Sequence, residues 1–142
     1  GVNLMFRLNR QLAEMIGRVG GYGVRIGEVH HTQKKDAPSG TALALADSMN
    51  EALDNAYTYT YDRSKERKKR EKTEIGISAV RGGSIVGEHE VIFAGLDEVI
   101  EFKHTAYSRS VFAKGAVQAA KFLSGKPEGF YDMGDVIKAT IA

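Results

Sequence analysis

The residues best suited to chemistry lie close together near the middle of the first half of the sequence. They are two adjacent histidines, His30 and His31, followed by Lys34 and then by Gly40 and Thr41. Histidine exchanges a proton near neutral pH, and a nearby lysine can hold its charge beside an anionic substrate. Gly40 and Thr41 stand where a helix would begin, and free N–H groups at a helix start bind carboxylates or phosphates. The segment therefore predicts a pocket for a small dianion that must be protonated.

The same residues also fit a simpler arrangement, a capped helix with histidines on the surface. Ser39 is a good N-cap residue for a helix that begins at the next position. Adjacent histidines at the end of a strand point to opposite faces, so only one of them can face a cleft. Spacing alone leaves both interpretations open.

A metal site is not predicted, although several residues are ligands by type. The histidines and the carboxylates nearest to them form no helical H-x-x-x-H pair and no common ligand spacing; they are Glu28, His30, His31, Glu88, His89 and His104. For Glu88 and His89 the pattern favours a cross-strand polar pair that helps to fix the register of a sheet.

The elements that must position these residues follow from apolar periodicity. Spacings of three and four indicate helices, and strict alternation indicates strands. The pattern predicts helices over residues 2–19, 40–53 and 109–123, and strands over residues 24–30, 74–80, 84–94 and 98–106. Short connections at residues 81–83 and 95–97 favour antiparallel hairpins, so the last three strands are predicted to form a meander. The expected fold class is α+β, with a mostly antiparallel mixed sheet and helices packed on one face.

The predicted sheet needs a cover on both of its faces. Apolar residues are expected on both sides of it, and they are Ile75, Ile77, Ile85, Val86, Val91, Ile92, Phe93, Ile100 and Phe102. A chain of this length has helices for one side only. The second face is therefore predicted to bind further copies of the chain, giving a homotetramer.

Composition narrows the class of protein. The chain has 142 residues, no cysteine and a formal net charge of +2, which fits a single domain without disulfides and argues against nucleic acid as a partner. No apolar run approaches the roughly 20 residues needed to cross a bilayer, so a cytoplasmic protein is expected. The highly charged residues 62–72 are predicted to be a solvated connector, with an electrostatic docking patch as the alternative.

At this point the sequence resembles a known family, dihydrodipicolinate reductase (4-hydroxy-tetrahydrodipicolinate reductase). The resemblance rests first on Glu28-Val29-His30-His31, on Lys34 and on the run from Asp36 to Leu43. Later landmarks follow in the family's order at residues 81–89, 104–109, 112–116 and 131–136. The resemblance covers nearly the whole chain, apart from the charged connector.

The resemblance implies an NAD(P)H-dependent oxidoreductase of lysine and diaminopimelate biosynthesis, built from two domains. Residues 1–142 would form the substrate-binding and oligomerisation domain, and the N-terminal Rossmann domain, which binds most of NADPH or NADH, would be absent from this chain. The chain alone is then expected to be inactive. The helix over residues 109–123 would pack towards the absent domain.

The resemblance also implies roles for individual residues. His30 matches the family's general acid and Lys34 its second catalytic residue. His31, Gly40 and Thr41 match, with Lys34, the groups that hold the dicarboxylate substrate, and Arg109 matches an arginine near the cofactor. A stand-alone dicarboxylate-binding domain or an assembly domain without catalysis remains the alternative, although a pure binding module needs no proton donor.

Overall fold

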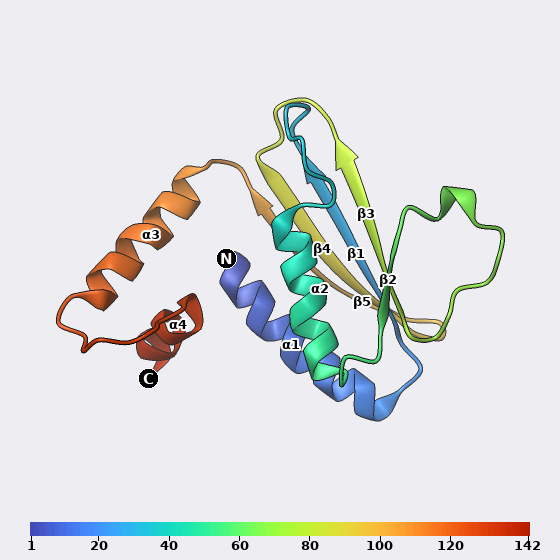
Figure 1. Ribbon diagram of the computed structural model, residues 1–142, viewed down its shortest axis with the longest axis horizontal. Helices are drawn as coiled ribbons and strands as arrows, with labels where there is room; N and C mark the ends of the chain where they lie inside the picture. The colour runs from blue at the N-terminus through green and yellow to red at the C-terminus, as the bar shows by residue number, and fades with distance from the viewer.

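The computed structural model describes residues 1–142 and contains one five-stranded sheet in the order β2-β3-β1-β4-β5 (Figure 1). The strands are β1 (Gly23–His30), β2 (Thr58–Tyr61), β3 (Glu74–Arg81), β4 (Gly87–Ala94) and β5 (Val99–Ala106). Strand β3 pairs in parallel with β1 and β2, whereas β4 pairs antiparallel with β1 and β5. The predicted α+β class with a mixed sheet is confirmed.

The predicted meander of the last three strands is wrong in one connection. Strands β4 and β5 form the expected hairpin, but β1 lies between β3 and β4. The chain after β3 crosses the end of β1, where the Gly82 N–H donates a hydrogen bond of 2.9 Å to the carbonyl oxygen of His30. Crossing one strand spans only about 10 Å, which a loop of a few residues covers as easily as a hairpin turn. The length of the segment after β3 could not show whether it forms a hairpin or crosses β1.

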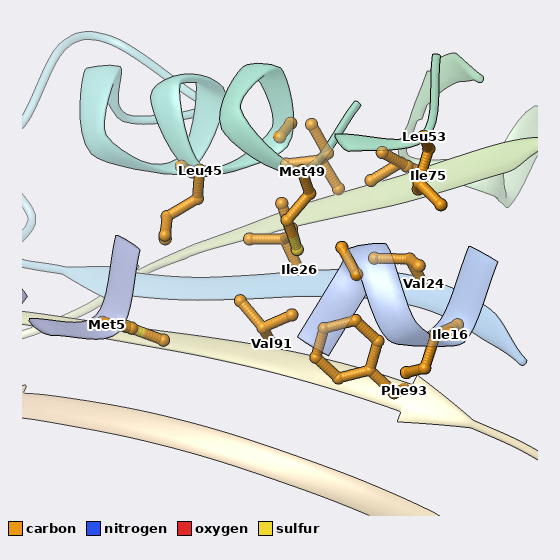
Figure 2. Close-up of a cluster of buried hydrophobic side chains, with 14 residues drawn as sticks. Met5, Ile16, Val24, Ile26, Leu45, Met49, Leu53, Ile75, Val91 and Phe93 are labelled. Carbon is orange, nitrogen blue, oxygen red and sulfur yellow. The ribbon is translucent and has the colours of Figure 1, made fainter. Parts of the chain in front are cut away.

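Two helices, α1 (Val2–Val19) and α2 (Gly40–Ala52), lie on one face of the sheet, as predicted (Figure 1). Figure 2 shows the core that they close against the central strands. Its fully buried members include Val24, Ile26, Leu45, Met49, Ile75, Val91 and Phe93. This packing fixes the end of β1 relative to the start of α2.

The prediction that apolar residues lie on both faces of the sheet holds only in part. The strand registers place Ile75, Ile77, Val91, Phe93, Ile100 and Phe102 together on the helix-covered face. The helix-free face is mixed: it carries the apolar residues Val29, Val80, Ile92 and Val99, and among its other residues are Arg25, Gly27, Ser78, Glu88, Glu90, Glu101 and Lys103. Ile85 and Val86 precede β4 and belong to a loop. The error arose because a list of apolar residues does not give the phase of each strand's alternation.

The charged connector is anchored to the helix-free face at two points. Most of residues 62–72 are exposed, as expected, and Arg63–Lys65 form a short 3₁₀ helix, η1. Arg63 and Arg70, however, both bind the carboxylate of Glu74, which is only 3% exposed. Burial alone would raise the pKa of Glu74, but its two arginine partners lower it below the usual range. The connector is therefore more than a solvated loop.

The C-terminal part stands apart from the sheet. The predicted helix is present as α3 (Ser110–Leu123), and a further helix, α4 (Met133–Ile141), was not predicted. Neither helix buries a residue fully, and a cavity of about 630 Å³ opens between them and the start of α1. None of the helices combines the length and apolar character that a membrane span requires.

Candidate functional site

The candidate site is built on the end of β1. Alternation along this strand turns Glu28 and His30 to the helix-covered side, where they are 1% and 8% exposed. Nδ1 of His30 lies 2.5 Å from Oε2 of Glu28. The Arg81 guanidinium donates two hydrogen bonds of 2.8 and 2.9 Å to the same carboxylate, and the Ser39 N–H donates a third of 3.0 Å. A buried carboxylate thus holds the ring of His30 from behind.

The contacts of Glu28 decide its protonation state. Burial would raise its pKa, but the hydrogen bonds from Arg81, His30 and the Ser39 N–H together lower the pKa below its usual range. Glu28 is therefore ionised at neutral pH and accepts hydrogen bonds only. It follows that Nδ1 of His30 carries the proton in this contact.

A second buried histidine, His89, lies directly behind the first. The ring of His89 lies edge-on to that of His30, with 5.0 Å between the ring centroids. Its Nε2 is 2.9 Å from Oγ of Ser39. The same Ser39 oxygen caps α2 by accepting the N–H of Ala42. Burial, and next the proximity of His30, lower the pKa of His89 to about 4. This histidine is neutral at physiological pH.

Gly87 keeps space beside the other nitrogen of the His30 ring. A Cβ atom added at Gly87 would lie 3.0 Å from Nε2 of His30, closer than ordinary contacts. Nε2 has no hydrogen-bond partner within the chain, in contrast to Nδ1. A residue larger than glycine would crowd this nitrogen.

The loop after β1 carries His31 and Lys34. The Lys34 N–H bonds the carbonyl of His31 at 3.1 Å, and its Nζ lies 3.0 Å from Oδ1 of Asp36. The hydrogen bond from Lys34 lowers the pKa of Asp36. Two contacts hold this loop against the end of β3 and the loop that follows it: Thr32 N–H to the Gly83 carbonyl (3.1 Å) and Arg81 to the Asp36 carbonyl (2.6 Å). The two loops lie side by side at the top of Figure 1.

Gly40 and Thr41 form the first turn of α2, next to the cap Ser39. Their N–H groups have no acceptor within the chain, as expected at a helix start. Since Ser39 bonds both Glu28 and His89, this helix start is fixed to the same network as His30. The structure thus places His30, His31, Lys34, Gly40 and Thr41 at one end of the sheet.

The other residues considered from the sequence have different positions. Arg109 is the exposed N-cap residue of α3, just beyond β5, and it makes no ion pair. Glu88 pairs with Lys103 across β4 and β5 at 3.1 Å, as expected of a cross-strand pair. His104, on β5, borders the large cavity near α3, and in the strand register it stands opposite His89.

Sequence reasoning missed the roles of Glu28, Arg81 and His89 in holding His30. A signal was present for Glu28, because residues two apart on a strand share a face. No local signal marked Arg81, which lies 53 positions from Glu28.

Comparisons with known proteins identify the family of the chain. A family profile described as "Dihydrodipicolinate reductase, C-terminus" matches residues 1–137. The chain is 49% identical to a 4-hydroxy-tetrahydrodipicolinate reductase of Caldanaerobacter subterraneus, over 97% of this chain and 54% of that protein. It is 50% identical to the reductase of the same name from Clostridium novyi, over 98% of this chain and 54% of that protein. The chain therefore spans about half the length of the curated relatives it matches.

A solved structure is also similar. It is described as "Dipicolinate bound Dihydrodipicolinate reductase from Paenisporosarcina sp. TG-14". The match has a TM-score of 0.59 and 25% identity, and it covers 82% of this chain and 45% of that one.

Proposed function

The chain belongs to the C-terminal family of dihydrodipicolinate reductases, and from this premise we propose that it is the substrate-binding half of such an enzyme. The reaction would be the NAD(P)H-dependent reduction of 4-hydroxy-tetrahydrodipicolinate (dihydrodipicolinate) to tetrahydrodipicolinate in lysine and diaminopimelate biosynthesis. The observation that carries the proposal is the orientation of His30. Its Nδ1 is held by Glu28, and its Nε2 is unpaired next to the loop of Lys34 and the start of α2.

In this proposal His30 is the general acid. The 4-hydroxyl group of the substrate would leave as water, and a bound nicotinamide cofactor would supply a hydride to the resulting conjugated ring, which leaves electron density on the adjacent carbon. The Nε2 proton of a protonated His30 then passes to that carbon, and the ring returns to the neutral form with its proton on Nδ1. Lys34, the second catalytic residue, holds a positive charge beside the reacting dianion.

The substrate carboxylates would be bound by groups with hydrogen-bond donors that the chain itself does not use. The free N–H groups of Gly40 and Thr41 and the ammonium of Lys34 are suited to bind carboxylate oxygens. His31 adds a half-buried ring on the same loop. The carboxylate of Asp36 neutralises Lys34 in the free chain, so the substrate would compete with it.

Most of the cofactor contacts would come from outside these residues. The chain has no glycine-rich turn between a strand and a following helix, which is the usual pyrophosphate site. Arg109 is the residue here that suits the anionic cofactor, because its exposed guanidinium has no partner in the chain.

Binding of pyridine-2,6-dicarboxylate tests the placement of the site. We expect weak binding to the chain, and an affinity about tenfold lower in Lys34→Ala, because one charge-assisted hydrogen bond is worth about 1.5–3 kcal/mol. Lys35→Ala is the matched control, since Lys35 is exposed and makes no ion pair. Calorimetry on the three proteins measures the effect. Equal affinities, or no heat in any of them, would contradict the site.

We also propose a homotetramer whose contacts include the helix-free face of the sheet. Its main support is charge complementarity, because the apolar residues of this face are few. The β1–β3 side of this face carries three arginines at Glu74: Arg63 and Arg70 bind its carboxylate, and Arg25 binds its backbone carbonyl oxygen. The β4–β5 side carries Glu88, Glu90 and Glu101, with Lys103 paired to Glu88. A two-fold axis through the face would bring each half against the opposite half of a second copy.

Light scattering checks the assembly. We expect a mass four times the 15.5 kDa of one chain, and dissociation in Glu90→Lys, which places a cation opposite the partner's arginines. Glu128→Lys makes the same charge change on the exposed α3–α4 connection and should remain tetrameric. A monomer at micromolar concentration would refute the proposal.

A further inference from the structure

Two buried ionisable groups lie behind the proposed proton donor and have no proposed contact with the substrate. Glu28 is 1% exposed and His89 is 5% exposed, and both contact the surroundings of His30. A buried carboxylate is costly unless it is fully paired. Such an arrangement at the base of a candidate general acid calls for a functional explanation.

We propose, on the basis of the reductase function, that Glu28 is a positioning residue that acts through His30. Its carboxylate keeps the His30 proton on Nδ1 when the ring is neutral, so that Nε2 is the nitrogen that takes up a proton from solvent and donates it to the substrate. Arg81 holds the carboxylate in place, and Gly87 leaves Nε2 accessible.

The carboxylate of Glu28 is fixed by its partners. Arg81 binds both oxygens in a fork, with one hydrogen bond to each, and the Ser39 N–H bonds Oε1. A bidentate pair of this kind prevents rotation of the carboxylate. Oε2 therefore remains directed at Nδ1 of His30. A water molecule or a hydroxyl in this place would accept or donate and would not select one tautomer.

The surroundings of His30 leave it as the one proton carrier of the histidine pair. The charged and titratable groups in contact with it are Glu28 on its own strand and His89 on β4, with Arg81 of β3 behind Glu28. His89 is neutral and bonds Ser39 Oγ through Nε2. Only His30 has a carboxylate to stabilise an imidazolium.

The tautomer of His30 can be measured directly in the chain. Nitrogen-15 NMR at about pH 8.5, above the ordinary histidine pKa, distinguishes a protonated Nδ1 from a protonated Nε2. We expect the Nδ1–H form in the wild type and a mixture of both forms in Glu28→Gln. Because Glu28→Gln leaves Arg81 without its charge partner and can impair folding, Arg81→Lys serves as a second variant. It keeps the positive charge, loses the fork and should also give a mixture.

Glu74→Gln is the matched control, because Glu74 is likewise buried and bound by two arginines but lies on the opposite face of the sheet. It should lower stability without changing the tautomer of His30. An unchanged Nδ1–H form in both Glu28→Gln and Arg81→Lys would overturn the proposal. So would a mixture of forms in the wild type.

The second readout is the activity of a chimaera. In it, the part of the Clostridium novyi relative that this chain does not match is joined to this chain. Glu28→Gln should lower kcat about tenfold or more with KM changed less than twofold, because substrate contacts are untouched while the proton donor is misaligned. An inactive wild-type chimaera would contradict the reductase function and leave the NMR result standing. An active chimaera in which Glu28→Gln has normal kcat would contradict the positioning role alone.

Discussion

His30→Gln is expected to lower kcat of the chimaeric reductase by about 10²- to 10⁴-fold, the usual cost of losing a positioned general acid. Glutamine approximates the size of the ring and can still bond Glu28, so the packing around the buried network is largely kept. The glutamine amide can donate hydrogen bonds, but it cannot act as a general acid near neutral pH. Steady-state rates of NADPH or NADH oxidation, measured with saturating substrate, test this expectation.

His31→Gln is the informative comparison. His31 follows directly in the sequence, but it belongs to the loop after β1 and is proposed only to contact the substrate. Its loss should raise KM and reduce kcat far less than His30→Gln does. A His30→Gln enzyme within threefold of the wild-type kcat would show that the proton comes from elsewhere.

The local parts of the site were predictable because their signals are local. Helix N-cap preference identified Ser39 and the free N–H groups of Gly40 and Thr41, and the structure places all three as expected. Alternation along β1 likewise predicted that only one of the adjacent histidines faces inward, and that residue is His30.

The support behind the site was not predictable, since it depends on strand order. Arg81 reaches Glu28 because β3 pairs directly with β1, with His30 opposite Arg81 in the register. A meander of the last three strands would have moved Arg81 away from β1. The connection after β3 gives no sign of its crossing, because glycines permit either a hairpin or a longer step. Hydrogen bonds between distant elements follow from topology, which periodicity does not contain.

Which residues lie on each face of the sheet depends on the phase of side-chain alternation along each strand. Val91 and Phe93 alternate with Ile92, so an apolar strand looks two-sided in the sequence. Pairing with β1 places Val91 and Phe93 against the helices and leaves Ile92 on the other face among charged residues. The short strand β2 was missed because its alternating threonines and tyrosines lack the aliphatic residues that mark the other strands.

Acidification should destabilise the chain through His89. Burial keeps this residue neutral in the folded state, with a pKa of about 4, whereas the unfolded chain has an ordinary histidine pKa near 6.5. Between these values the unfolded state binds more protons than the folded state. Stability is therefore complete above pH 6.5 and is lost as the pH falls towards 4, by about 2 kcal/mol between pH 7 and pH 4.5.

Urea unfolding at pH 7 and pH 4.5 measures this loss, with His89→Gln as the test variant. The variant is expected to be less stable at pH 7, because it weakens the link to Ser39 Oγ, but its stability should fall less on acidification. His31→Gln removes a half-buried histidine and should retain the wild-type dependence. His104, whose pKa is also lowered by burial, is present in all three proteins.

Because the unfolding measurements stop at pH 4.5, they separate the titration of His89 from that of the buried carboxylates. Glu28 and Glu74 have lowered pKa values, so their contribution to stability persists above the ordinary carboxyl pKa and disappears only at lower pH. A wild-type loss equal to that of His89→Gln would mean that His89 accepts a proton in the folded chain. It would then compete with His30 for the proton that the proposed reaction requires.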